Sequence, residues 1–95
     1  MDETEVCPVE CPTIVAVTLD DRLDGARPVQ DVLTRFGSVI RVRLGIHTPD
    51  RPNEQGLILL QLCCEDAETR ELLDSLNAIS GVRAQAMKIG PAAST

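Results

Sequence analysis

The chain has 95 residues, of which 43% are hydrophobic and 25% charged, as expected for one globular domain with a single core. Its formal charge of −6 comes from 15 acidic and 9 basic residues, and the basic residues are dispersed along the chain. Phe36 is the only aromatic residue, so the chain offers no aromatic platform on which bases could stack. An acidic chain of this kind repels phosphate backbones, and we do not expect direct nucleic-acid binding.

No apolar run approaches the roughly 20 residues that a membrane-spanning helix needs. Residues 1–5 read Met-Asp-Glu-Thr-Glu and lack the positive charge that begins a signal peptide. We therefore expect a cytoplasmic protein with no membrane partner. In that compartment the four cysteines should be reduced thiols or metal ligands rather than disulfides.

The first half of the chain predicts a strand, a helix and a second strand. Residues 1–12 form an acidic tail, and the β-branched, apolar stretch 13–19 predicts a strand that stops at Asp20. Asp24 and Gly25 predict a turn, after which Pro28 would lie in the first turn of a helix that Gly37 ends. Apolar residues recur along this helix at helical spacing: Val29, Val32, Leu33 and Phe36.

Apolar residues at every second position predict the next strand at 39–46, and the proline-containing stretch 47–55 predicts a loop. A third strand is expected at 56–64. A second amphipathic helix follows, with Asp66 as its N-cap and Ser80-Gly81 closing it. Residues 82–89 predict the last strand, and 90–95 a short tail. The apolar residues of the second helix are Leu72, Leu73, Leu76 and Ile79.

The element order βαββαβ predicts an α+β ferredoxin-like domain over residues 13–89. In this fold a four-stranded antiparallel sheet, in the order 4-1-3-2, carries both helices on one face. We expect the helix-facing core to contain Val15, Val17, Leu19, Ile40, Val42, Leu44, Ile58, Leu60 and Leu62.

The stretch Leu57–Cys63 is apolar on both side-chain parities, which is typical of a strand buried on both faces. Burying one leucine stabilises a protein by about 1.5 to 3 kcal/mol, so an apolar face left in water is unfavourable. We expect a second subunit to cover it, giving a dimer or tetramer. The alternative is a set of isolated surface apolar residues, which are common. The expected contact residues are Ile14, Ala16, Leu57, Leu59 and Cys63.

Three segments resemble one family of short proteins. They are the run from Val32 to Ile46, with Phe36-Gly37 and Arg43-Leu44-Gly45-Ile46, the strand Leu57–Leu62, and the run from Leu76 to Arg83, with Gly81-Val82-Arg83. In these segments the chain resembles the iron-only hydrogenase system regulators, which are ACT-like proteins encoded near hydrogenase genes. More distantly, it is similar to ACT amino-acid-sensing domains and to the C-terminal domain of nickel-responsive repressors.

The resemblance covers residues 13–89 and implies an oligomeric, ligand-sensing regulatory module. It does not identify the ligand, for which an amino acid is one candidate. Two features depart from the family pattern: His47 stands where proline is usual, and the loop from Thr48 to Gln55 is longer.

Four cysteines and one histidine are candidate metal ligands: Cys7, Cys11, Cys63, Cys64 and His47. Cys7 and Cys11 precede the first strand, and Cys63 and Cys64 end the third strand. These two strands are antiparallel neighbours in the predicted sheet, so all four thiols could converge on Zn²⁺ or an iron–sulfur cluster. Against this, successive strand residues point to opposite faces. Buried or idle thiols, a redox dithiol at Cys7 and Cys11, and a solvent-facing histidine remain alternatives.

The similarity to ACT domains implies a ligand-binding role for Asp20, Asp24 and Gly25, and Arg41 and Arg43, with Arg83 as a further cation, are candidates for holding an anionic ligand. The aspartates also fit turn and capping chemistry, and the arginines also fit charges on an edge strand. No phosphate loop and no nucleophile–base set is visible, so neither catalysis nor a cofactor is expected. The sequence therefore predicts a regulatory module, with a metal or redox sensor and a ligand-free adaptor as alternatives.

Overall fold

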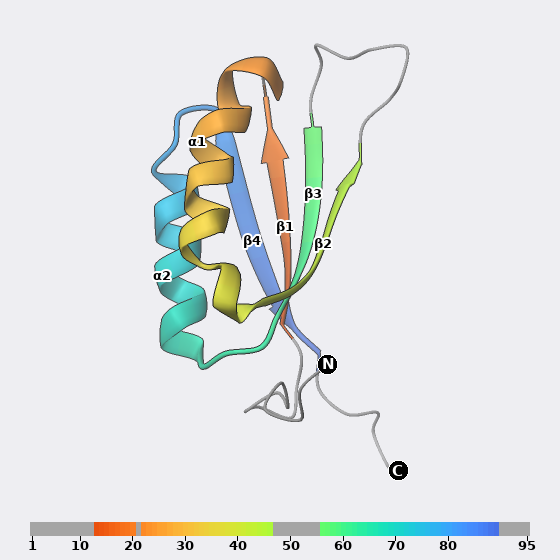
Figure 1. Ribbon diagram of the computed structural model, residues 1–95, viewed down its shortest axis with the longest axis vertical. Coiled ribbons are helices and arrows are strands. Elements are labelled where there is room, and N and C mark those ends of the chain that lie inside the picture. The colour runs from red at the N-terminus through yellow and green to blue at the C-terminus, as the bar shows by residue number, and fades with distance from the viewer. Residues whose placement is uncertain (1–12, 21, 47–55, 90–95) are drawn as a thin grey trace.

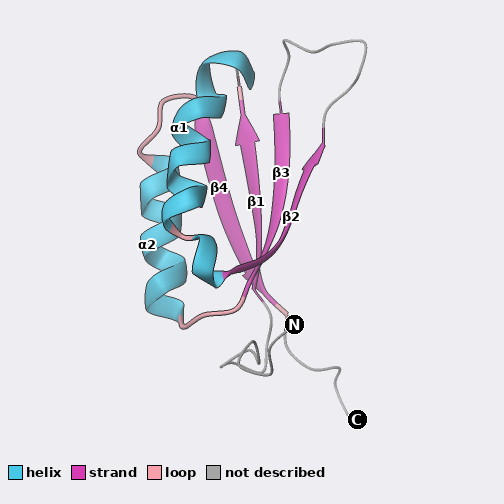
Figure 2. Ribbon diagram, viewed as in Figure 1, coloured by secondary structure: helices cyan, strands magenta, loops and turns pink. Residues whose placement is uncertain are grey.

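Seven elements make up the fold, which a computed structural model describes over residues 13–20, 22–46 and 56–89. All strand pairs in the sheet are antiparallel, and both helices cover one face (Figures 1 and 2). The sheet order β2-β3-β1-β4 is the predicted order 4-1-3-2 read in reverse, so the ferredoxin-like arrangement is confirmed. The elements are β1 (Thr13–Leu19), α1 (Arg22–Arg35), a 3₁₀ turn η2 (Gly37–Val39), β2 (Ile40–Ile46), β3 (Gly56–Leu62), α2 (Asp66–Asn77) and β4 (Val82–Lys88).

The predicted tails 1–12 and 90–95 and the predicted loop 47–55 lie outside the described residues. Among the helices that the structure does describe, none is long and apolar enough to cross a membrane.

The core lies between the sheet and the two helices. Burial alternates along β1, where every second residue from Thr13 to Leu19 faces the helices. Leu60 and Leu62 of β3 are buried in the same layer. The helices bury apolar residues three and four positions apart, which is the spacing that places side chains on one helix face. These residues are Val29, Val32 and Leu33 of α1, and Leu72 and Leu76 of α2.

A β-bulge in β2 changes which of its side chains face the helices. Ile40 lies opposite Leu62, but the next paired residue, Val42, lies opposite Gln61. The extra residue reverses the side of every residue that follows it. Val42 and Leu44 therefore point away from the helices and are 52% and 53% exposed. The prediction that these two residues belong to the helix-facing core is wrong.

Helix α1 also begins earlier than the sequence indicates. It includes Asp24 and Gly25, which were expected in a turn, and it places Pro28 in its interior instead of its first turn. An interior proline has no N–H to donate to the preceding helical turn, so rules based on proline position start the helix too late. The helix ends at Arg35, and Gly37 begins the 3₁₀ turn that leads into β2.

The N-terminus of α2 is capped by Glu65, and not by Asp66 as predicted. The Glu68 carboxylate accepts a hydrogen bond of 3.2 Å from the Glu65 N–H, which forms half of a reciprocal capping box. Asp66 is the first helical residue, and its carboxylate lies 2.7 Å from the Lys88 ammonium of β4.

The side of the sheet that carries no helix, here called the helix-free face, is largely apolar. The ladder aligns Leu44, Leu59 and Ala16 in one row across β2, β3 and β1. Next to this row, Ile14 lies opposite Met87, which is 61% exposed. Four of the five predicted contact residues, Ile14, Ala16, Leu57 and Leu59, stand on this face. The described residues on this face include Val42, Leu44, Leu57, Leu59, Gln61, Ile14, Ala16, Thr18, Arg83, Gln85 and Met87.

Candidate functional site

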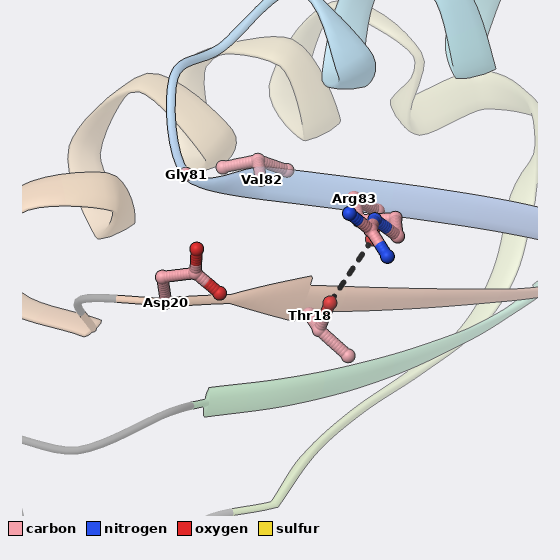
Figure 3. Close-up of a pocket in the computed structure, with 5 residues that line it drawn as sticks. All are labelled: Thr18, Asp20, Gly81, Val82 and Arg83. Carbon is pink, nitrogen blue, oxygen red and sulfur yellow. Dashed lines mark hydrogen bonds between the residues drawn. The ribbon is translucent and has the colours of Figure 1, made fainter.

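A pocket of about 270 Å³ lies where β1 ends and β4 begins (Figure 3). Thr18 and Asp20 come from the end of β1, and Gly81, Val82 and Arg83 come from the turn before β4 and its first residues. Segments more than 60 residues apart in the sequence meet here because β1 and β4 are antiparallel neighbours.

Backbone hydrogen bonds fix the shape of this corner pocket. The Asp20 N–H donates to the Gly81 carbonyl at 2.8 Å, and the Val82 N–H donates to the Ile79 carbonyl at 3.1 Å. Gly81 has φ +78°, in the left-handed region that glycine adopts without steric cost. This backbone conformation explains why the turn residue is glycine. The turn leads into β4, where Arg83 lies opposite Thr18.

Two opposite charges stand in the pocket without an ion-pair partner. Asp20 and Arg83 are exposed, and within the described part of the chain neither makes a salt bridge. Asp20 comes from the end of β1, whereas Arg83 projects from the neighbouring β4 (Figure 3). A guanidinium binds a carboxylate through paired N–H groups, and a carboxylate accepts hydrogen bonds from an ammonium. The pocket therefore suits a small polar ligand that carries both charges.

The structure separates the residues that the sequence grouped as a ligand site. Asp20 lines the pocket, and Asp24 and Gly25 lie in α1, the helix that follows. Arg41 and Arg43 lie on β2, with β3 and β1 between them and β4. The Arg43 guanidinium donates to the Gln30 side chain of α1.

Three pocket residues were missed by sequence reasoning, namely Thr18, Gly81 and Val82. The signal was present in the predicted topology, because the sheet order 4-1-3-2 places the end of β1 beside the start of β4. The sequence groups Arg83 with the β2 arginines, whereas the structure places it in the same pocket as Asp20.

The two adjacent cysteines face different surroundings. Cys64 is buried in the core, with its Sγ 3.4 Å from the Thr69 hydroxyl. Cys63 is disulfide-bonded. The expectation of reduced thiols is therefore wrong for Cys63.

The remaining candidate ligands of a metal site, Cys7, Cys11 and His47, lie outside the described residues. Within residues 13–20, 22–46 and 56–89, no group of three or more His, Cys, Asp or Glu side chains is placed to hold a metal ion.

No family model and no curated protein matches this chain. Among solved structures, the chain is similar to the uncharacterized protein TM1266 from Thermotoga maritima, with 25% sequence identity and a TM-score of 0.74. The match covers 83% of this chain and 96% of that chain, and it supports the ferredoxin-like arrangement of four strands and two helices.

Proposed function

We propose that this protein is a non-enzymatic regulatory module that self-associates through its helix-free face and binds a small effector in the corner pocket. The observation that carries the proposal is that Asp20 and Arg83, two opposite charges that form no ion pair within the described part of the chain, line one pocket. Thr18 and Arg83 also stand on the helix-free face, so the pocket and the association surface share residues.

The effector that best fits these charges is a zwitterion such as a free amino acid. Its carboxylate would pair with the Arg83 guanidinium, which presents a rigid fork of N–H donors. Its ammonium would donate to the Asp20 carboxylate. Because both protein groups are exposed, each interaction is screened by water, and selectivity depends on the ligand satisfying both at once.

Self-association follows from the apolar character of the helix-free face. Four strands of seven residues give a sheet face of about 440 Å², from a strand spacing of about 4.8 Å and a rise of about 3.3 Å per residue. Specific interfaces commonly bury about 800 Å² of accessible surface per partner. We expect this face to form a dimer, and its affinity depends on packing and charge rather than on area alone.

The biological setting of this regulation is proposed from the sequence resemblance to hydrogenase system regulators.

The five residues that line the corner pocket include one carboxylate, one guanidinium and one hydroxyl, with no histidine or thiol. This set suits binding better than acid–base chemistry, since no residue pair in it provides an activated nucleophile.

A thermal-shift screen of amino acids tests the pocket. A ligand present at 100 times its dissociation constant stabilises the folded state by about 2.7 kcal/mol, which raises the Tm of a domain this small by roughly 10 °C or more. We expect Arg83→Ala to remove this shift. The Arg27→Ala variant, which removes an exposed arginine from α1, should retain it.

Derivatives of the stabilising amino acid identify which charges matter. Its amide lacks the carboxylate and its N-acetyl form lacks the ammonium, so neither should stabilise the protein. A screen in which no amino acid, nucleotide or metal raises the Tm would contradict ligand binding and favour a structural adaptor.

A thiol–disulfide switch at Cys63 is a second candidate function, and the disulfide at this residue favours it. A dithiol reductant of the thioredoxin class would transfer two electrons and two protons to the disulfide, releasing two protein thiols while the reductant forms its own disulfide. A four-thiolate metal sensor is less well supported, because Cys64 points into the core.

Differential alkylation followed by mass spectrometry tests this switch. We expect Cys63 to resist alkylation in air-purified protein and to react after treatment with dithiothreitol. Cys64 serves as the internal control, because its burial should keep it unreactive in both states as long as the protein is folded. A Cys63 thiol that reacts fully before reduction would exclude the switch.

A further inference from the structure

The outer edge of β4 is covered by hydrogen bonds from outside the sheet. In an antiparallel ladder, alternate residues of an edge strand direct their N–H and C=O groups away from the neighbouring strand. In β4 these outward-facing residues are Val82, Ala84 and every second residue after them. The Val82 N–H donates to the Ile79 carbonyl at 3.1 Å.

Ala84 is covered by a single side chain from the end of α2. The Ala84 N–H donates to the Asn77 Oδ1 at 2.8 Å, and the Asn77 Nδ2 donates to the Ala84 carbonyl at 3.1 Å. This reciprocal pair of bonds is the one that a residue of a neighbouring antiparallel strand would make. The Asn77 amide thus occupies the place of an additional strand.

A groove of about 480 Å³ lies along α2 and β4 on the other side of Asn77, lined among others by Leu73 of the helix and Ala86 of the strand. The Asp66–Lys88 ion pair closes its far end, with both side chains well exposed. Asn77 is therefore the side chain of α2 that covers this edge at Ala84.

We propose that Asn77 closes the β4 edge against strand pairing, and that the partner this edge would otherwise accept is β4 of a second copy. An antiparallel pair centred on Ala84 would place Arg83 of each copy opposite Gln85 of the other, so no like charges meet. The reciprocal bonds now made by Asn77 would pass to the second Ala84.

Closure of this edge has a consequence for assembly. The other edge strand, β2, carries the bulge at Arg41 and the charged Arg43, and both features disfavour strand pairing. Because strand pairing is disfavoured at both edges of the sheet, association is directed to the helix-free face.

Hydrogen exchange of the Ala84 amide tests the closure directly. We expect Asn77→Ala to accelerate this exchange at least tenfold, whereas Glu71→Ala, an exposed change on the same helix, should leave it unaltered. Asn77→Asp keeps an acceptor for the Ala84 N–H but has no donor for its carbonyl. It provides a milder variant if Asn77→Ala does not fold.

Edge pairing is tested in a Leu59→Lys background, in which the helix-free face carries a charge. We expect Leu59→Lys alone to be monomeric and the double variant with Asn77→Ala to self-associate. Unchanged Ala84 exchange in both Asn77 variants, or fast exchange with a monomeric double variant, would overturn the inference. A Leu59→Lys protein that remains dimeric would instead contradict the proposed face contact, while Ala84 exchange would still decide the role of Asn77.

Discussion

Replacement of Leu59 by lysine is expected to yield a folded monomer. Leu59 lies between Leu44 and Ala16 at the middle of the apolar part of the helix-free face. A two-fold contact uses the same patch on both subunits, so one substitution places two ammonium groups in the interface. Burying an unpaired charge is strongly unfavourable, and we expect the dissociation constant to rise at least 100-fold, which corresponds to about 2.7 kcal/mol.

Sedimentation velocity over a micromolar concentration series measures this change. Thr34→Lys adds the same charge to an exposed position of α1 and should leave association unchanged. Leu59 is half-buried within its own subunit, and a lysine stem can pack along that surface with its ammonium in water, so the variant should fold. A parent protein that sediments as a monomer throughout the series would remove the basis for the proposed assembly.

The sequence predicts which side chains are buried in a strand whose residues alternate regularly between the two faces of the sheet. In β1, every second residue from Val15 to Leu19 is buried, as the period-two pattern predicts. In β2 the same pattern misassigned Val42 and Leu44, because their side depends on the bulge after Ile40. A bulge is a property of strand pairing, and the alternation within a single strand contains no signal for it.

The candidate site was predictable to a similar extent. Asp20 was a candidate because of the sequence similarity to ACT domains. That Asp20 lines the same pocket as Arg83 depends on sheet order, in which strands distant in sequence become neighbours. Arg41 and Arg43 were grouped with Asp20 because they are arginines on one strand, and that strand lies at the opposite edge of the sheet from β4.

The bulge in β2 leads to a second prediction with a large effect, based on two leucines that sequence reasoning placed in the same core. Leu60 is 1% exposed, whereas Leu44 is 53% exposed. We expect Leu60→Ala to lower the free energy of unfolding by about 2 to 5 kcal/mol, the range for deleting a buried leucine side chain. Leu44→Ala should lower it by less than about 1 kcal/mol, because little of its surface is removed from water within one subunit.

Urea denaturation of both variants in the Leu59→Lys background measures these changes without a contribution from association. The comparison removes the same atoms from two positions whose burial differs, so the loss should be much larger for Leu60→Ala than for Leu44→Ala. Small domains are stable by only about 5 to 15 kcal/mol, and a loss at the upper end of the Leu60 range would leave little folded protein. Equal losses from the two variants would mean that Leu44 faces the helices, which would restore the uninterrupted alternation in β2 and remove two apolar side chains from the helix-free face.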